Sequence, residues 1–428
     1  MTAKTITRRG MLGSLAGLGI AATLGCGGPG STTGGAADPV ESGGEITGEV
    51  NFYHWRNEDK AILDELAASF VAAHAGVELT QTIDPSEQYQ STAAQKARDG
   101  AIGDSLTALA GAQFNQFAEL GLFADLSDAA FGGNYEANLI TPGASGGSQL
   151  GFPYQLIFNM PLLNTDLAER AGLSQAPADW DAWLDALDKL RGIGVVPIAW
   201  PGNDPANAFQ IINSLVMNHG PSDDMFAGIE DGRYAATDDW WIAALTQFKE
   251  LSGYFQDNFA GAGVDGVLAQ FSQGEAAILP TGSYQIGQVR EAGGEFGLEF
   301  APLMTNSADE QPKYEGIFNS TFILGVNSAA GNAAGALAWV EFLSQPENAA
   351  VYANGTSQHV TVSGVEYENA DLQALAPWAT RNNLLAPRFQ FLNLDIRSAI
   401  ENSLVAVATG ASPEQAAEQA QKLVEENR

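Results

Sequence analysis

Strand and helix patterns alternate through the first third of this chain, and this alternation restricts its fold more than any other feature of the sequence. Residues 50–55, 77–83 and 106–110 have the two-residue period or the short apolar run of a strand. Each is followed by apolar residues at helical spacing, and the second helical segment lies between Pro85 and Gly100, the usual residues at helix starts and ends. Three strand-helix units within about 75 residues predict a mainly parallel, doubly wound α/β sheet.

The rest of the chain is predominantly helical, with a few returning strands. A Gly-rich loop at 141–151 separates the two regions. Further helices are predicted at 206–217, 240–251 and 264–271, and further strands at 194–200, 276–279, 297–303 and 321–326. A mature chain of roughly 400 residues can bury a sufficient core without disulfides, and its length predicts two domains.

The first residues have the pattern of an export signal. Arg8 and Arg9 resemble the pair of a twin-arginine signal, and the apolar run at 11–24 is shorter than the ~20 residues that span a bilayer. The only cysteine, Cys26, follows the letters TLG, which resemble a bacterial lipobox with two positions exchanged. We therefore expect a signal peptide of the twin-arginine type at 1–25 and a lipidated Cys26 that anchors the protein, outside the cytoplasm, to the cell membrane.

Residues 26–46 are expected to form a flexible linker, because they are rich in Gly and Thr and have little to bury. Under the alternative interpretation, cleavage after Ala36 or Ala37 releases a secreted protein without an anchor. The signal holds three basic residues and no acid, so the mature chain is still more acidic than the full sequence, whose net charge is −32. This charge repels nucleic acid and anionic lipid and argues against both as partners; a saline habitat, an anionic wall and solubility alone each explain it.

Several segments spread over the chain carry patterns of one family. They are QFAELGLFADL at 116–126, GFPY at 151–154 with FNMPLL at 158–163, AGL at 171–173 with Pro177 and WDAW at 180–183, and FSQGEAAI at 271–278 with GSY at 282–284. In order and spacing they resemble the family 1 extracellular solute-binding proteins, sugar-binding lipoproteins that deliver sugars to bacterial ABC importers.

The resemblance implies a fold and its domain limits. The expected fold is α/β, a two-lobe periplasmic-binding-protein-like fold of type II, with doubly wound sheets joined by hinge crossovers and the ligand in the cleft between the lobes. Lobe 1 is expected at 47–155 and 303–356, and lobe 2 at 156–302 and 357–428. The chain departs from the family pattern, which often has Pro, a lysine-containing turn and Trp, at Gly103, Met160-Pro161 and Tyr284. These departures leave the identity of the sugar open.

A sugar has hydroxyl groups at its edges and C–H bonds on its faces, so its site combines aromatic platforms with polar side chains. Open α/β sheets bind ligands beyond the carboxyl ends of their strands. By resemblance to the family's Gly-Ser-Trp element, Tyr284 is expected to be the stacking platform of the second lobe. The other candidates are Trp55, Arg56 and Asn57 after the first strand, Gln113 after the third, Tyr154 and Gln155 on the crossover, Trp200, Asn203 and Asp204 after the strand from 194, and Phe318 and Asn319 before the returning strand.

Some of these candidates have a structural interpretation as well. Trp55 could cap the sheet as a core aromatic, Gln113 could cap a helix, and the crossover pair could serve only as a hinge. Arg381 and Arg388 are further candidates, which surface ion pairs would explain equally.

Enzymatic chemistry has little support in the sequence. GASGG at 143–147 fits the G-x-S-x-G pattern of hydrolases, but no helix follows it to expose a nucleophile. The four histidines are scattered without metal-site spacing, and no glycine-rich phosphate loop occurs, so no cofactor and no metal are expected. We expect a non-enzymatic, monomeric receptor that binds a carbohydrate, preferably an oligosaccharide, and passes it to ABC transporter permease subunits. The alternatives are a receptor for a charged solute (a polyamine, an amino acid or a phosphate ester) and a surface-anchored glycosidase.

Overall fold

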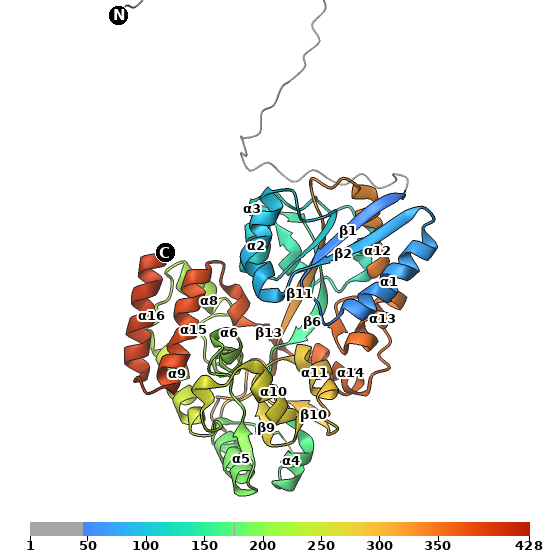
Figure 1. The fold of residues 1–428 in the computed structure, drawn as a ribbon. Coiled ribbons are helices and arrows are strands. Elements are labelled where there is room, and N and C mark those ends of the chain that lie inside the picture. Colours follow the sequence, from blue (N-terminus) through green and yellow to red (C-terminus); the bar gives the residue numbers. More distant parts are fainter. Residues whose placement is uncertain (1–45, 175) are drawn as a thin grey trace, which may run out of the picture. The chain divides into compact units, whose positions relative to one another are not determined.

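The structure of the chain, a computed structural model, describes residues 46–174 and 176–428 (Figure 1). The predicted signal peptide, Cys26 and nearly all of the predicted linker lie outside the described residues. No helix within the described ranges has both the length and the apolar character that a membrane span needs.

The three strand-helix units predicted from the sequence form one side of the larger sheet. β1 (Gly48–His54) pairs in parallel with both β2 (Val77–Ile83) and β3 (Ser105–Ala108), as predicted. The apolar side chains at helical spacing become the buried faces of the helices between them, as Leu63, Leu66 and Phe70 do in the first one. These helices are α1 (Lys60–Ala73), α2 (Ser86–Arg98) and α3 (Ala112–Glu119).

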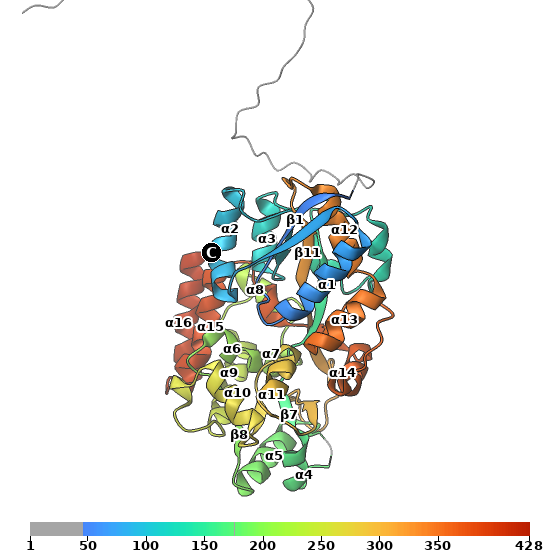
Figure 2. The same cartoon turned by 45° about the vertical axis from the view of Figure 1, so that its right-hand side comes forward.

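Two long strands complete the larger sheet and lead toward the second part of the molecule. β11 (Gly316–Val326) pairs antiparallel with β3 on one side and with β6 (Phe152–Phe158) on the other. The short strands β12 (His359–Val360) and β13 (Asn383–Leu385) add to β6 and to β11. Two helices from the later part of the chain, α12 (Ala333–Leu343) and α13 (Pro346–Thr356), also pack on this lobe. Figures 1 and 2 show α1 and α13 side by side on one face of the sheet, and α2 and α3 on the other.

The smaller sheet belongs to a second, mainly helical lobe. Its four strands, in spatial order, are β10 (Leu298–Phe300), β7 (Leu162–Asn164), β9 (Ala276–Leu279) and β8 (Val196–Ile198). The helices around it include the C-terminal pair α15 and α16, which pack against each other and against α9 (Figure 2). The helices are α4 (Thr165–Arg170), α5 (Trp180–Gly192), α6 (Pro205–Ala208), α7 (Gln210–Val216), α8 (Met225–Glu230), α9 (Asp239–Ser252), α10 (Val264–Ser272), α11 (Ile286–Glu291), α14 (Ala370–Leu375), α15 (Leu394–Ala408) and α16 (Pro413–Asn427).

Short elements connect these parts. The hairpin of β4 (Ala144–Ser145) and β5 (Ser148–Gln149) turns through Gly146 and Gly147, both with positive φ, so the G-x-S-x-G segment lies in a hairpin and not at a strand-helix turn. The 3₁₀ helices are η1 (Ala130–Asn134), η2 (Thr141–Gly143), η3 (Phe259–Gly261), η4 (Ser283–Gln285), η5 (Ala376–Thr380) and η6 (Pro387–Gln390).

Each sheet has its own hydrophobic core, as expected for two lobes. The chain passes from the larger to the smaller sheet between β6 and β7, and it returns between β10 and β11. The exact lobe limits remain a prediction. One departure is visible: β12 and β13 come from 357–428, the segment expected in lobe 2, yet both pair with strands of the larger sheet.

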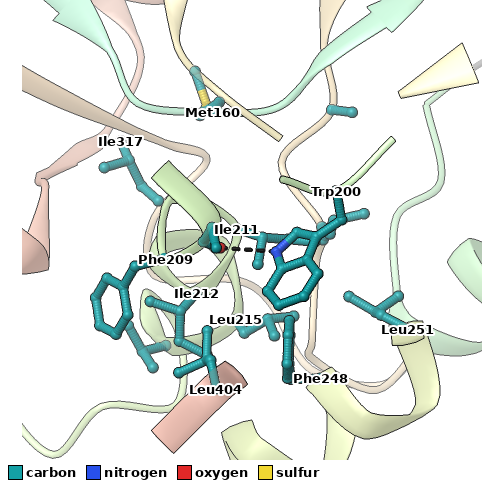
Figure 3. Close-up of a cluster of buried hydrophobic side chains, with 14 of the residues drawn as sticks. Met160, Trp200, Phe209, Ile211, Ile212, Leu215, Phe248, Leu251, Ile317 and Leu404 are labelled. Carbon is teal, nitrogen blue, oxygen red and sulfur yellow. Dashed lines mark hydrogen bonds between the residues drawn. The ribbon is translucent and has the colours of Figure 1, made fainter. Parts of the chain in front are cut away.

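Trp200 lies at the centre of the second lobe's core and not at its surface. Its ring is fully buried and stacks on Phe255, with ring centroids 4.9 Å apart. Its indole Nε1 donates a hydrogen bond to the carbonyl oxygen of Ala208, 3.0 Å away, among the apolar side chains of α7 and α9 (Figure 3). The ring is packed and its polar atom is hydrogen-bonded inside the core, so Trp200 is not available to contact a ligand.

Candidate functional site

A cavity of about 510 Å³ lies where the two crossing strands meet segments of both lobes. This volume is in the range typical of small-molecule sites. From the first lobe it is lined by Trp55, Arg56, Leu109, Ala110, Ala112, Gln113 and Gln116; from the crossing strands and the residue after β6 by Gln155, Ile157, Asn159, Asn319 and Thr321; and from the segments of the second lobe by Ala206, Asn207, Gln210, Tyr284, Arg388, Phe389, Leu392, Leu394 and Arg397.

The floor of the cavity is one face of β6 and β11. Side chains alternate along a strand, so Gln155 and Ile157 share a face, as do Asn319 and Thr321. The register places Asn319 opposite Ile157 and Thr321 opposite Gln155. Polar side chains from adjacent strands therefore gather on the side that faces the cavity.

Two buried amides at the cavity have polar atoms without hydrogen-bond partners among the described residues. Asn319 is only 1 % exposed, and neither its amide oxygen nor its amide nitrogen has a partner in the described part of the chain. Asn159 donates from Nδ2 to Oε1 of Gln210 at 3.3 Å, but its own Oδ1 is unpaired among the same residues. Leaving a buried polar atom unpaired costs about 1–3 kcal/mol, so such atoms favour a polar ligand in the cavity.

Aromatic side chains form two walls that come from different lobes. Trp55, 6 % exposed, follows β1 and packs between Tyr89 and Phe322, with both ring-centroid distances at 5.1 Å. The hydroxyl of Tyr284, in η4, donates to Oδ1 of Asn207 at 3.1 Å. Burial raises the pKa of Tyr284, because it disfavours the phenolate. Both rings are therefore held by their neighbours and present a fixed surface to the cavity.

Arg56 is bound within a network that joins the first lobe to the crossing strands. Its guanidinium makes two hydrogen bonds to the carboxylate of Asp59, at 2.7 and 3.1 Å, and an ion pair with Glu58 at 2.9 Å. The hydroxyl of Tyr352 donates to the same Asp59 carboxylate and accepts from Nε2 of Gln155 at 2.6 Å. Two cavity residues are thus positioned by one buried network.

Six of the twelve candidate residues line the cavity. Gln113 borders the cavity, and its Oε1 accepts from the backbone nitrogen of Leu109 at 2.9 Å, in the loop before α3; it does not cap that helix. Trp55 likewise is mostly buried and lines the cavity. The six residues are Trp55, Arg56, Gln113, Gln155, Tyr284 and Asn319.

The remaining six do not line it, for local reasons. Tyr154 and Phe318 are strand neighbours of two lining residues, so alternation directs them to the opposite face. Asp204 caps α6, accepting from the backbone nitrogen of Asn207 at 3.1 Å and from its Nδ2 at 2.8 Å. The others are Trp200, in the core, and Asn57 and Asn203, which are exposed.

Several lining residues were not among the sequence-based candidates. The alternation Gln155, Ile157, Asn159 along the crossover was a signal for Asn159, which directly follows β6 in phase with the two lining residues of that strand. Arg388 is a sequence candidate that a surface ion pair would explain equally; its ion pair with Glu401 is largely buried. Asn207, Gln210 and Arg397 come from helices whose position against the crossing strands has no local signature in the sequence.

A larger cavity, of about 870 Å³, lies within the second lobe and is bordered by Trp183, Glu299 and Trp378. It does not touch the crossing strands β6 and β11 or the first lobe's sheet. Among the described residues, no group of three or more His, Cys, Asp or Glu is arranged to hold a metal ion. The cavity between the lobes is therefore the candidate site.

Comparisons with known proteins agree with this architecture. The chain is 28% identical over 142 residues to proteins named "Probable sugar-binding periplasmic protein" from Brucella suis biovar 1 (strain 1330) and Brucella melitensis biotype 1, and the match spans 33% of this chain and 33% of each relative. It thus covers about a third of the length of these curated relatives.

Solved structures resemble the chain over most of its length. A chitin oligosaccharide binding protein has a TM-score of 0.75 at 19% identity, covering 89% of this chain and 99% of its own. A sugar transporter protein from Bacillus licheniformis, solved in complex with stachyose, has a TM-score of 0.71 at 17% identity, covering 88% of this chain and 98% of its own. At these identities the likeness shows the fold, which is the two-lobe fold of periplasmic binding proteins.

The sequence also matches a family model described as bacterial extracellular solute-binding protein, over residues 55–350. That family is one of extracellular binding proteins and not of enzymes. Since the match extends over more than half of the residues of this chain, the chain belongs to the bacterial extracellular solute-binding protein family.

Proposed function

We propose that this chain is an extracytoplasmic carbohydrate receptor that binds a sugar, preferably an oligosaccharide, in the cavity between its lobes and delivers it to an ABC importer. The names of the Brucella relatives and of the oligosaccharide-binding structures support a carbohydrate as the ligand. Membership in the solute-binding family supports delivery to a membrane importer.

The observation that carries the proposal is the unpaired amide of Asn319 between two aromatic walls. Its oxygen and nitrogen can accept from and donate to sugar hydroxyls, and Oδ1 of Asn159 can accept another bond. Trp55 and Tyr284 offer apolar faces to the C–H bonds of a sugar ring. A purely apolar ligand would leave the amides unpaired, and a purely ionic one would not use the rings.

Delivery by cleft closure follows from the origin of the walls. Trp55 belongs to the first lobe and Tyr284 to the second, so only a closed arrangement brings both against one ligand. Ligand binding then favours the closed form because that form makes the larger number of contacts. The permease subunits of the importer are the proposed partners, and they would recognise the closed form of a monomeric receptor.

Attachment to the membrane through a lipidated Cys26, after export by the twin-arginine signal, completes the proposal. Capture near the permease raises the effective concentration of loaded receptor at the membrane. Mass spectrometry of the protein made in a bacterial host tests this part separately: a lipid mass on Cys26 is expected, and an unmodified chain starting at Ala37 or Asp38 would contradict it.

A thermal-shift screen with neutral and acidic mono- and oligosaccharides tests the proposed ligand class. A sugar that binds only the folded state raises the melting temperature, by an amount that grows with its concentration. Stabilisation by at least one carbohydrate, with the sugar recovered intact after incubation, is the expected result. Stabilisation by amino acids or polyamines alone, or release of shorter sugars, would contradict the proposal.

A further inference from the structure

The charge of the candidate cavity is opposite to that of the chain. The full sequence has 51 acidic and 19 basic residues. Yet the described residues that line the cavity include three arginines and not one aspartate or glutamate.

Arg56 is already neutralised. Its bonds to Asp59 and its ion pair with Glu58 engage Nε and both Nη nitrogens. On the first-lobe side of the cavity, one guanidinium therefore faces two carboxylates and leaves no positive charge uncompensated.

Arg388 and Arg397 share a single carboxylate on the opposite side. Nε of Arg388 donates to Oε1 of Glu401 at 2.8 Å, and Nε of Arg397 lies 3.4 Å from that same oxygen. All three side chains are largely buried, with exposed fractions of 10%, 17% and 5% for Arg388, Arg397 and Glu401. Two guanidinium groups against one carboxylate leave one positive charge uncompensated.

The hydrogen bonds, like the charges, leave this pair of arginines without enough partners. Nε of Arg397 has no hydrogen-bond partner in the described part of the chain, and no bond to the Nη nitrogens of either arginine is made by those residues. Burial, with the neighbouring charge of Arg388, lowers the pKa of Arg397 to about 10, which still leaves it charged at neutral pH. Two other carboxylates of the second lobe are engaged elsewhere: Asp204 accepts from Asn207, and Glu230 accepts from the backbone nitrogen of Leu392.

Building on the proposed function, we propose that the ligand is an acidic saccharide whose carboxylate or phosphate oxygens bind the Nη nitrogens of Arg388 and Arg397. Guanidinium groups pair with such oxyanions through two parallel hydrogen bonds. The amide of Asn319 and the rings of Trp55 and Tyr284 then hold the sugar ring itself. The same local charge disfavours a polyamine beside Arg388 and Arg397, where a cation would meet two guanidinium groups and one carboxylate.

The test is calorimetric titration of the mature protein with matched pairs of saccharides. One arm compares galacturonate and glucuronate mono- and oligomers with their neutral methyl esters, and a second compares hexose phosphates with free hexoses. Acetate and inorganic phosphate serve as anions without a sugar. The variants are Arg397→Gln, Arg397→Lys to retain the charge, and Arg233→Gln, which removes an exposed arginine paired with Asp224 and Asp231.

We expect an acidic saccharide to bind at least about ten-fold more tightly than its neutral partner. Arg397→Gln should reduce that ratio by about ten-fold, Arg397→Lys should restore part of it, and Arg233→Gln should leave it unchanged. The arm that shows the effect identifies the carboxylate or the phosphate. The Lys variant keeps the test valid if Arg397→Gln fails to fold.

Three outcomes would overturn the inference. If neutral saccharides bind at least as tightly as their acidic partners, the inference fails and the carbohydrate receptor stands. If acetate or inorganic phosphate binds as well as any saccharide, the arginines form an anion site without sugar recognition. If no saccharide of either kind binds, the proposed function fails as well.

Discussion

Asn319 illustrates how one side chain can be unfavourable for folding and useful for binding. It is buried, opposite Ile157 in the sheet, with both amide atoms unpaired in the described part of the chain. A core position with this environment would favour an apolar residue, since the unpaired amide loses hydration without recovering hydrogen bonds. Its place on the cavity floor gives the amide a role that packing alone does not explain.

Replacing Asn319 separates these two effects. Asn319→Ala should change the free energy of unfolding without ligand by less than about 1 kcal/mol, because no hydrogen bond is lost. Affinity for the saccharide should fall by about ten-fold, or about 1.4 kcal/mol. Denaturant titration and calorimetry measure the two quantities.

A matched control is Asn164→Ala. Asn164 is equally buried, but its side chain caps α4 by accepting from the backbone nitrogen of Leu167 at 3.1 Å. This variant should cost about 1 kcal/mol of stability and leave affinity unchanged. An Asn319→Ala variant that behaves like the control would show that Asn319 is only structural.

Tyr284 should act through its ring. Tyr284→Ala removes the second-lobe wall and should weaken saccharide affinity at least about ten-fold, or about 1.4 kcal/mol, with little change in the ligand-free melting temperature. Tyr254→Ala is the comparison, since Tyr254 lies against Arg191 and Asp188 outside the cavity. Equal affinities of the two variants would exclude Tyr284 as a platform.

At the scale of elements, the crossing strands determine which residues meet. β11 pairs in parallel with β13 at residues 316–318 and antiparallel with β3 at residues 323–326. Phe322 lies at this change of partner with φ of 52°, which is unusual for a bulky residue, and its buried ring packs against Trp55 at 5.1 Å. The positive φ at Phe322 thereby coincides with the change of strand partner next to the first-lobe wall.

The loop between β3 and α3 lies close to η6. A substitution in this loop therefore tests whether the approach of the two lobes is needed for binding. Gly111 has φ of +84°, and a Cβ placed there would lie 2.7 Å from the carbonyl oxygen of Phe389. Gly111→Ala should therefore oppose this approach and weaken saccharide affinity, measured by calorimetry.

Gly121→Ala controls for a positive φ without a close contact. Gly121 has φ of +65° with nothing within 4 Å of a Cβ. Both variants should lose stability because alanine disfavours a positive φ, and Gly111→Ala should lose more because its ψ of −132° lies outside the left-handed helical region; only Gly111→Ala should lose affinity. A loss of affinity shared equally by both would assign the effect to backbone strain.

The sequence predicted the α/β class, the parallel group of β1, β2 and β3, and six of the residues that line the candidate cavity. The sequence did not predict which of Gln155 and Tyr154, or of Asn319 and Phe318, faces the cavity. Which face of a strand borders the cavity depends on the elements that cover its other face. Trp200 was assigned to the site because it ends a strand, yet the second lobe buries it completely. Arg397 is brought to the cavity only by tertiary packing.

Two buried histidines should make the stability of the whole molecule depend on pH. Burial lowers the pKa of His54 and of His359 to about 4, from 6.5. Nδ1 of His54 accepts from the backbone nitrogen of Arg56 at 3.1 Å, which requires an unprotonated nitrogen. As pH falls from 6.5 toward 4, the unfolded chain binds protons at these rings while the folded chain does not, so the free energy of unfolding decreases.

The expected loss is up to about 3 kcal/mol for each histidine across that window, measured by denaturant titration at a series of pH values. Replacing His359 with Asn should reduce the slope by about half. A free energy of unfolding that stays constant between pH 6.5 and pH 4 would contradict the burial of neutral imidazoles.

The most direct test of a saccharide site between the lobes uses the position of Trp55. Of the eight tryptophans in the chain, Trp55 alone lines the cavity. Titration with a saccharide that calorimetry shows to bind should produce a saturable change in tryptophan fluorescence, and Trp55→Phe should remove most of that change while binding persists. A change of full size in Trp55→Phe, or no fluorescence response to a bound saccharide in the wild type, would contradict binding in this cavity.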